Sequence, residues 1–407
     1  MEDQQMKKLC LRIECTYAAA QTMYWAMACT IQGFTSVFLS HRGLSDGQIG
    51  VTVSIISVLG ILLQLFVSNF CDHHPEIALK KIITAINIYT AFWVGVMKLS
   101  VMPPLLLAAV FILAEAPQRV NTGLMNALFM QYNNAGIPAR FGWPRGVGSM
   151  GWALGAFFFG RIIAGNGRTP DMLLSMFLFF AIFAVASVMA MPGNANSEKK
   201  IKTKEVPSSY KEMILGNRTL RLFLVSLMLL GIGQVSISTF LNRIVEAVGG
   251  GTAEQGIAIL IQSGMELPMM VLSPILLKRF KAGTLVAFCM FSYTVRTILL
   301  MLCGSLTALY CVMSFGLICY GIYGFAAILF VNDIVDVDQK VRAQSLIALC
   351  FTGGIGGVIG NIAGGSILEH YGINMVYLFS VVFSLLGFGT MLLSLASWNK
   401  QQRERVH

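Results

Sequence analysis

The sequence carries little charge. Asp, Glu, Lys and Arg make up 12% of its 407 residues, whereas soluble proteins average about 25%. A water-soluble fold needs more charge to cover its surface, so this composition excludes a soluble enzyme. Hydrophobic residues make up 56% of the chain, and the mean hydropathy is +0.71. Both values are typical of a protein that crosses a membrane many times.

Several motifs are also missing. The nine cysteines include no CxxC pair, and most lie in apolar runs, where they act as small hydrophobes. We find no Walker A loop, nucleophile elbow or HExxH sequence. The histidines of Asp72-His73-His74 are adjacent and point in different directions, which does not suit a metal site. We therefore expect no enzyme activity, no ATP-driven transport, no cofactor and no metal.

What is present is a series of apolar runs of about 20 residues, the length that a helix needs to cross a bilayer. Twelve such spans are expected: Thr16–Ser40, Gly47–Phe70, Ile82–Met97, Pro104–Met130, Arg145–Ala164, Asp171–Met191, Leu220–Leu241, Ala253–Leu277, Thr284–Leu302, Leu306–Ile334, Ser345–Leu368 and Asn374–Ser397. The long polar stretch between spans 6 and 7 divides them into six plus six. We expect an N-terminal half (1–192), a cytoplasmic linker (193–217) and a C-terminal half (218–407).

The placement of basic residues orients these spans. With both termini in the cytoplasm, 22 of the 29 basic residues fall on the cytoplasmic side, as the positive-inside rule requires. The net charge of +10 is thus a topology signal, and no nucleic-acid partner is expected. We expect a multi-pass, monomeric protein of the cytoplasmic (plasma) membrane, surrounded by lipid.

An internal repeat relates the two halves. At an offset of 202 residues, Gln32 matches Gln234 and Arg140 matches Arg342. Two parallel six-helix repeats are typical of transporters that rock around a site at the midplane between the halves. The sequence therefore predicts two pseudo-symmetric halves.

Two segments resemble the lactose-permease-like branch of the major facilitator superfamily, which contains oligosaccharide and nucleoside proton symporters. They are Gly43-Leu-Ser-Asp-Gly-Gln-Ile-Gly50 and Phe141-Gly-Trp-Pro-Arg145-Gly-Val-Gly-Ser-Met-Gly151-Trp152. The loops around Asp72, Arg140 and Arg342 resemble gating loops of the superfamily. The resemblance covers nearly the whole chain and implies an all-α membrane protein of twelve helices with the major facilitator fold.

The same resemblance implies roles for individual residues. The arginine matching Arg145 would bind sugar hydroxyls, and the tryptophan matching Trp152 would stack on the sugar ring. The chain departs from the branch at two places. The second sugar-binding carboxylate would fall near Asn126 or Ala127, neither of which is acidic, and the proton-coupling pair would fall near Cys319 and Ile322. Coupling through that pair is therefore not expected here.

Four charged residues lie deep within the spans, and we expect them to mark a pathway because such charges are costly in a bilayer. Glu115 and Arg119 lie four residues apart on one helical face and can pair directly; the pair is either structural or functional. Glu266 and Arg296 either pair permanently, or Glu266 alternates between proton and substrate. Pro268 loosens the helix at Glu266.

Polar and aromatic residues recur at helical spacing in span 1, at Tyr24, Trp25 and Gln32, and span 7 carries Gln234. Such a stripe suits the wall of a cavity, although interhelical hydrogen bonding would also explain it. The predicted substrate-binding residues are Tyr24, Trp25, Gln32, Arg119, Arg145, Trp152, Gln234, Glu266 and Arg296. Those for proton coupling are Glu266 and Glu115.

Together these patterns predict a secondary active transporter of a small polar metabolite, either a sugar, an oligosaccharide or a nucleoside. The coupling ion would be a proton, with sodium as the alternative. Two arginines would also suit an organic acid, and a drug exporter of the same fold is a further alternative. A membrane receptor or an intramembrane enzyme is the remaining one.

Overall fold

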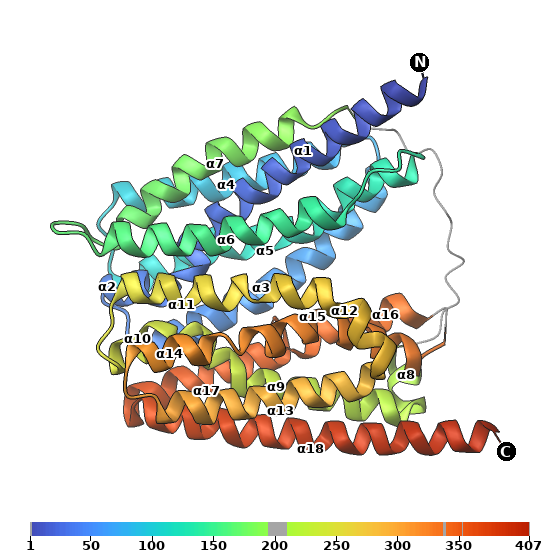
Figure 1. Cartoon of the computed structure of the whole chain (residues 1–407). Coiled ribbons are helices and arrows are strands. Elements are labelled where there is room, and N and C mark those ends of the chain that lie inside the picture. The colour runs from blue at the N-terminus through green and yellow to red at the C-terminus, as the bar shows by residue number, and fades with distance from the viewer. Residues whose placement is uncertain (1, 194–209, 337–338, 352, 407) are drawn as a thin grey trace. The chain divides into compact units, whose positions relative to one another are not determined.

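The computed structural model describes residues 2–193, 210–336, 339–351 and 353–406, and its regular secondary structure within these ranges is helical (Figure 1). The helices are α1 (Glu2–Ala28), the π-helix η1 (Cys29–Gly33), α2 (Thr35–His41), α3 (Asp46–His73), α4 (Leu79–Leu99), α5 (Pro104–Asn134), α6 (Gly142–Ile163), α7 (Met172–Ala190), α8 (Tyr210–Gly216), α9 (Arg218–Thr239), α10 (Leu241–Ala247), α11 (Thr252–Gly264), α12 (Glu266–Arg279), α13 (Ala282–Leu302), α14 (Leu306–Met313), α15 (Gly316–Ile334), α16 (Lys340–Cys350), α17 (Ile355–Tyr371) and α18 (Ile373–Val406).

The prediction of an all-helical membrane protein is confirmed. In the described ranges, nine helices are long and apolar enough to cross a bilayer, or ten if the pair α10 and α11, bent by 117°, counts as one. Helices α1 and α5 are not among the nine, and both carry buried polar side chains. The total of twelve spans stays a prediction.

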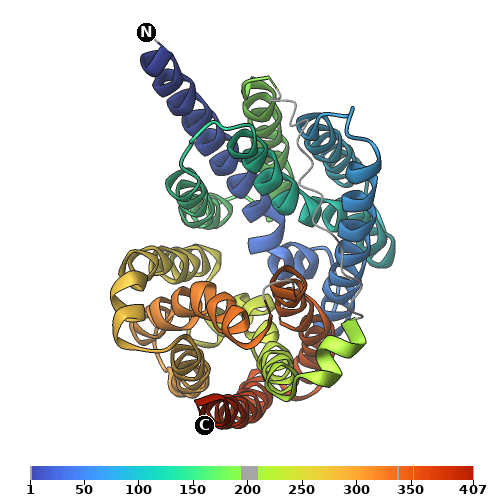
Figure 2. The same ribbon diagram turned by 90° about the vertical axis from the view of Figure 1, so that its right-hand side faces the viewer.

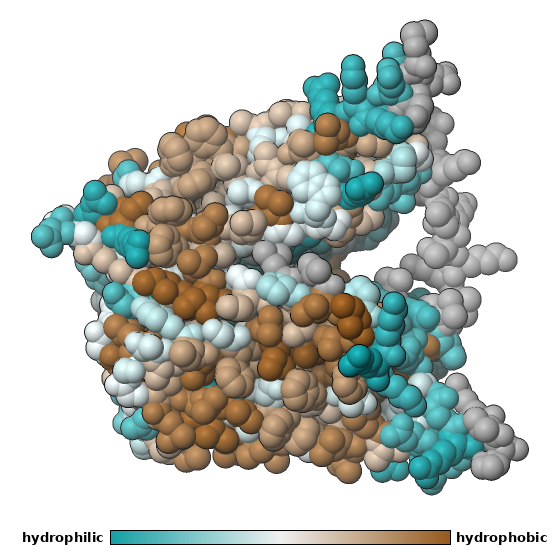
Figure 3. Space-filling model, viewed as in Figure 1, coloured by the Kyte–Doolittle hydropathy of each residue, from teal (hydrophilic) through white to brown (hydrophobic). Residues whose placement is uncertain are grey.

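The outer surface of these helices is apolar. On α13 and α18, residues such as Phe288, Phe291, Leu385 and Leu393 are exposed. Figure 3 shows brown, hydrophobic side chains over these two helices, while hydrophilic ones gather at the C-terminal end of α18. Exposed apolar belts with polar ends are what lipid contact requires.

The chain forms two compact units. Unit 1 contains residues 1–44, 58–203 and 252–264, and unit 2 contains 45–57, 204–251 and 265–407. The start of α3 thus packs with unit 2, and α11 packs on α6 in unit 1. Of the expected linker, residues 194–209 lie outside the described ranges, and the division into two pseudo-symmetric halves stays a prediction.

Unit 1 is built on close contact between α1 and α6. A Cβ atom at Gly151 would lie 2.5 Å from the carbonyl oxygen of Thr22, so only glycine permits this approach. Unit 1 also has an apolar core that includes Tyr17, Phe129 and Tyr132.

Replacing Gly151 with alanine is expected to cost about 1–3 kcal/mol of stability, because the new methyl group forces the two backbones apart. Thermal unfolding of the purified protein in detergent measures the loss. Gly95→Ala is the matched control, since a Cβ atom there meets nothing within 4 Å. Equal melting temperatures for the two variants would contradict this account of the α1–α6 contact.

Unit 2 packs α9 against α18, and α13 against both α15 and α18. In Figure 2 these helices are seen nearly end-on. Their apolar core includes Phe223, Tyr293 and Phe330. Three expected spans of the chain are interrupted: α11 and α12 are separate at Met265, α14 and α15 are separate at Ser314–Phe315, and α16 ends at Cys350 before α17 begins at Ile355. Discontinuous helices of this kind often carry transporter sites.

Candidate functional site

Three of the predicted substrate residues meet in unit 1. The rings of Trp25 on α1 and Trp152 on α6 lie edge to face, with centroids 5.9 Å apart and planes at 80°. The Arg145 guanidinium carbon lies 5.1 Å from the centroid of the Trp25 ring. All three side chains are half-buried. They combine a cation and two aromatic faces in one place.

A chain of hydrogen bonds fixes the Trp25 ring. Its Nε1 donates to Gln21 Oε1 at 3.0 Å, and Gln21 Nε2 donates to the hydroxyl of Tyr17 at 2.5 Å. The Tyr17 hydroxyl in turn donates to Asn126 Oδ1 at 3.2 Å. Asn126, which stands where the resembling branch has a carboxylate, thus ends a relay that orients the indole.

Tyr24 and Gln32 lie further along the same segment. The Tyr24 hydroxyl donates to the Gln118 carbonyl oxygen at 3.1 Å and bonds Thr122 Oγ1 at 2.9 Å, which ties α1 to α5. Gln32 lies in the π-helix η1, and its side chain is half-buried. Single π-helical turns often mark functional sites.

The pairing of Glu115 with Arg119 is confirmed. Arg119 Nη2 lies 2.7 Å from Glu115 Oε1. The carboxylate side chain is 1% exposed and the guanidinium side chain 34% exposed. The pair thus joins a fully buried carboxylate to an arginine that is partly open.

A buried polar strip next to this pair was not identified from the sequence. Asn121 Nδ2 on α5 donates to Asn87 Oδ1 on α4 at 2.8 Å and to Gln118 Oε1 at 3.4 Å. All three side chains are buried. Two asparagines and a glutamine inside otherwise apolar spans were the signal that could have revealed it.

In unit 2, Arg296 lies beneath an aromatic ring. Its side chain is buried, its guanidinium carbon lies 5.6 Å from the Tyr320 ring centroid, and Nη2 donates to Met313 Sδ at 3.5 Å. Tyr320 is half-buried, and its hydroxyl lies 3.3 Å from that of the exposed Ser238. Sequence reasoning missed Tyr320, which lies between the buried arginine and the exposed Ser238.

Glu266 is the first residue of α12, directly after the break at Met265. Proline clashes with the carbonyl group four residues earlier, which here belongs to Gly264, the last residue of α11. The loosened helix predicted at this point is therefore present. Glu266 is half-buried at the α12 N-terminus, where the helix dipole favours a negative charge.

Gln234 holds three helices of unit 2 together. Its Nε2 donates to Thr297 Oγ1 on α13 at 3.0 Å and to Ser384 Oγ on α18 at 2.8 Å. The side chain is buried. These contacts are the interhelical bonding that the sequence left as an alternative to a cavity wall.

The predicted gating residues lie at helix ends. Asp72 is exposed near the end of α3, and the following His74 Nδ1 lies 2.9 Å from Glu76 Oε1. A bond from its own backbone N–H, and that contact, hold the pKa of Glu76 below its usual value. Arg140 is exposed before α6, and the Arg342 guanidinium carbon lies 5.9 Å from the ring of Tyr210.

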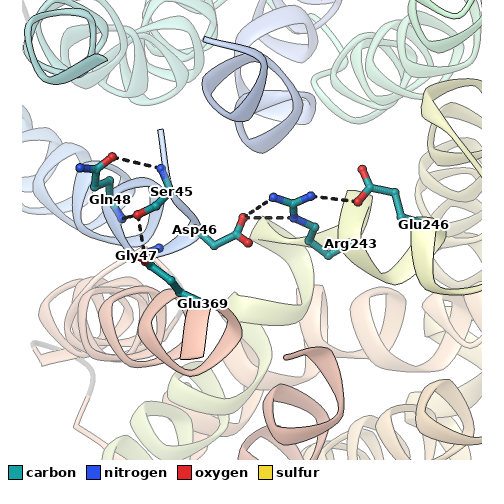
Figure 4. A network of polar contacts seen from close by, with 7 residues as sticks. All are labelled: Ser45, Asp46, Gly47, Gln48, Arg243, Glu246 and Glu369. Atoms are coloured by element: carbon teal, nitrogen blue, oxygen red, sulfur yellow. Dashed lines mark hydrogen bonds and ion pairs between the residues drawn. The ribbon is translucent and has the colours of Figure 1, made fainter. Parts of the chain in front are cut away.

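A polar network anchors the start of α3 within unit 2 (Figure 4). Arg243 on α10 bonds Asp46 Oδ1 through Nε at 3.1 Å and Nη2 at 3.0 Å. Glu369 on α17 accepts from Ser45 Oγ at 2.9 Å and from the Gly47 N–H at 2.8 Å. The polar residues of the Gly43–Gly50 segment thus serve to hold the first turn of α3 on α10 and α17.

Membrane helices interrupted in mid-span, with buried polar and charged side chains, are typical of integral membrane transporters. Residues 15–379 match the model of the MFS_1 like family, so the chain belongs to this family of the major facilitator superfamily. The resemblance to the major facilitator superfamily drawn from the sequence is confirmed. The protein is a secondary transporter and not an enzyme.

Known relatives agree with this assignment. An uncharacterized transporter of Bacillus subtilis (strain 168), YwbF, is 23% identical over 376 residues, which is 90% of this chain and 89% of the relative. The crystal structure of the nucleoside transporter NupG has a TM-score of 0.75 at 16% identity and covers 96% of this chain and 99% of that one. A bacterial homologue of the iron transporter ferroportin, in an inward-facing state, has a TM-score of 0.69 at 14% identity, covering 94% and 98%. These two structures share the fold.

Proposed function

We propose that the protein carries a neutral metabolite with hydroxyl groups and a flat ring face, a sugar, an oligosaccharide or a nucleoside, together with a proton. The observation that supports this best is the cluster of Trp25, Arg145 and Trp152. Arginine donates several hydrogen bonds in a fixed geometry, and the indole offers a flat surface for a ring. This combination suits hydroxyls on the edge of a ring.

Each residue has a separate task in this proposal. Arg145 donates to substrate hydroxyls, Trp152 stacks on the ring, and Gln32 adds a hydrogen bond from the π-turn. Tyr24 positions α1 against α5, and Gln234 positions α9 against α13 and α18. Arg296 supports the Tyr320 ring from below. Asp72, Arg140 and Arg342 belong to loops that move during alternating access.

Proton coupling is assigned to two carboxyl groups. Glu266 lies beside a helix break, where local movement can change its surroundings between states. Glu115 is the second, with its charge balanced by Arg119. The proton enters or leaves Glu266 as the substrate binds or departs, which links the two movements.

An organic acid is the second candidate substrate, because the spans contain two arginines. The charge of Arg119 is neutralised by Glu115, and the Arg296 side chain is buried beneath Tyr320. Neither of these arginines is therefore placed to bind a carboxylate, which favours a neutral substrate. We also propose that the protein is a monomer in the cytoplasmic membrane, surrounded by lipid, with both termini inside the cell.

Uptake of radiolabelled sugars, nucleosides and carboxylates into proteoliposomes tests the substrate class. Arg145→Lys is expected to lower kcat/KM for a neutral substrate about tenfold or more, because lysine keeps the charge but loses the planar set of donors. Arg161→Lys is the matched control, since Arg161 also stacks on an aromatic ring of α6, Phe157, at 4.0 Å. Uptake of carboxylates alone, with Arg145→Lys fully active, would reject the proposal.

A further inference from the structure

Glu14 joins α1 to the start of α6. It lies on α1, eleven residues before Trp25, and its side chain is buried although it is a carboxylate. Oε1 accepts a hydrogen bond from the backbone N–H of Arg140 at 2.8 Å. Oε2 accepts one from Trp143 Nε1, also at 2.8 Å. The two carboxylate oxygens therefore bind two groups of one short segment, residues 140–143.

The first turn of α6 depends on Glu14 because its own residues provide no side-chain cap. Phe141, at the N-cap, makes no side-chain cap, and the first turn of α6 contains no acidic residue. That turn includes Gly142, which is conformationally free, and Pro144, which has no N–H. The N-terminus of a helix attracts a negative charge, and Glu14 provides it from a neighbouring helix.

Arg145 lies in this same first turn, two residues after Trp143. Its guanidinium carbon lies 5.1 Å from the centroid of Trp25, which is on the same helix as Glu14. Helix α1 thus holds the first turn of α6 through the carboxylate of Glu14 and carries the ring over which Arg145 lies. Further along, the close contact of Gly151 with Thr22 fixes the spacing of the two helices.

We propose that Glu14 is a positioning residue for the substrate site. By fixing the first turn of α6, it sets the place of the Arg145 guanidinium over Trp25 and so the direction of its donors. This inference rests on the substrate role proposed for Arg145 and extends it to a residue that does not itself contact the substrate.

The first test needs no transport. Phenylglyoxal modifies accessible arginines, and mass spectrometry of the full-length protein measures its rate at Arg145. Glu14→Gln removes the charge and replaces one of the two accepting oxygens with an amide nitrogen, so only one of the bonds to Arg140 and Trp143 can persist. We expect the rate at Arg145 to rise several-fold, with the rate at Arg161 and the melting temperature nearly unchanged. Trp143→Phe, which removes only the indole donor, is expected to act in the same direction.

The second test is a double-mutant cycle with the labelled sugar or nucleoside that the wild type takes up. Glu14→Gln is expected to raise KM about tenfold, equivalent to about 1.4 kcal/mol. In an Arg145→Lys background the same change should add little, because two residues acting through one contact are not additive. Glu404→Gln, which changes an exposed carboxylate near the end of α18, is the control.

The outcomes separate the two claims. An unchanged modification rate at Arg145, or full additivity in the cycle, overturns the positioning role of Glu14. A raised modification rate, together with normal uptake by Arg145→Lys, upholds the positioning role and rejects the substrate role of Arg145. A lower melting temperature with unchanged KM would make Glu14 a stabilising residue only, and would also overturn the inference.

Discussion

Glu266→Gln is expected to abolish proton-driven accumulation of substrate while leaving the exchange of internal for external substrate intact. An amide at this position cannot take up or release a proton. Substrate movement is then no longer linked to proton movement, and a pH gradient cannot drive accumulation. Exchange requires only that the substrate-loaded carrier changes conformation. Glutamine can still make the hydrogen bonds of a protonated glutamate in that state. The expected loss of accumulation is complete, and the remaining exchange should no longer depend on pH.

Uptake driven by an imposed pH gradient, and counterflow without one, measure the two activities separately. Glu254→Gln is the matched control, because Glu254 lies in the first turn of α11, at the N-terminal end of the expected span that has Glu266 in its middle. Normal pH-dependent accumulation by Glu266→Gln would contradict the assignment. Glu115 would then be the next candidate for the proton carrier.

Arg119→Gln is expected to destabilise the protein by about 3–5 kcal/mol, because it leaves the buried Glu115 carboxylate without its partner. Glu115→Gln should cost less, since Arg119 is 34% exposed and can turn toward water. The double variant Glu115→Gln/Arg119→Gln should recover most of the stability, because it leaves no buried charge unpaired.

Thermal unfolding in detergent measures these differences, and size-exclusion profiles confirm that each variant is folded. A melting temperature for Arg119→Gln equal to that of the wild type would contradict the structural role of the pair. Transport by the stable double variant then decides between the two interpretations of the pair. If the double variant transports normally, the pair serves stability. If transport is lost, Glu115 serves proton coupling.

Features that depend on neighbours in sequence could be predicted. Long apolar runs identified the membrane helices, and the four-residue spacing of Glu115 and Arg119 predicted their ion pair. Pro268 indicated the interruption, which falls at Met265. In each case the physical cause, hydropathy, helical periodicity or a missing backbone donor, acts within one or two turns.

Contacts between distant segments could not be predicted in this way. Glu14 and Trp143 are 129 residues apart, and Ser45 and Glu369 are 324 apart. No periodic pattern links such residues, and each looks like an ordinary polar residue near a helix end. Tyr320 could not be predicted for a related reason. Aromatic residues are common in apolar spans, and only the contact of its ring with Arg296 distinguishes it.

The packing partners of the start of α3 also have no signal in the sequence. The first turns of α3 belong to unit 2 by their contacts with α10 and α17, although the sequence places them in the N-terminal half. Gly50 lies so close to α17 that a Cβ atom would collide with the carbonyl oxygen of Asn361. Close backbone packing of this kind has no hydropathy signal, because glycine is nearly neutral on such scales.

The most direct test of the proposed function is the movement of protons in proteoliposomes that contain a pH-sensitive dye. Addition of a sugar or nucleoside outside is expected to acidify the interior, and Glu266→Gln liposomes should show no acidification. Uptake of the same labelled compound without any pH change would contradict proton coupling. It would instead make the protein a uniporter or a sodium-coupled carrier.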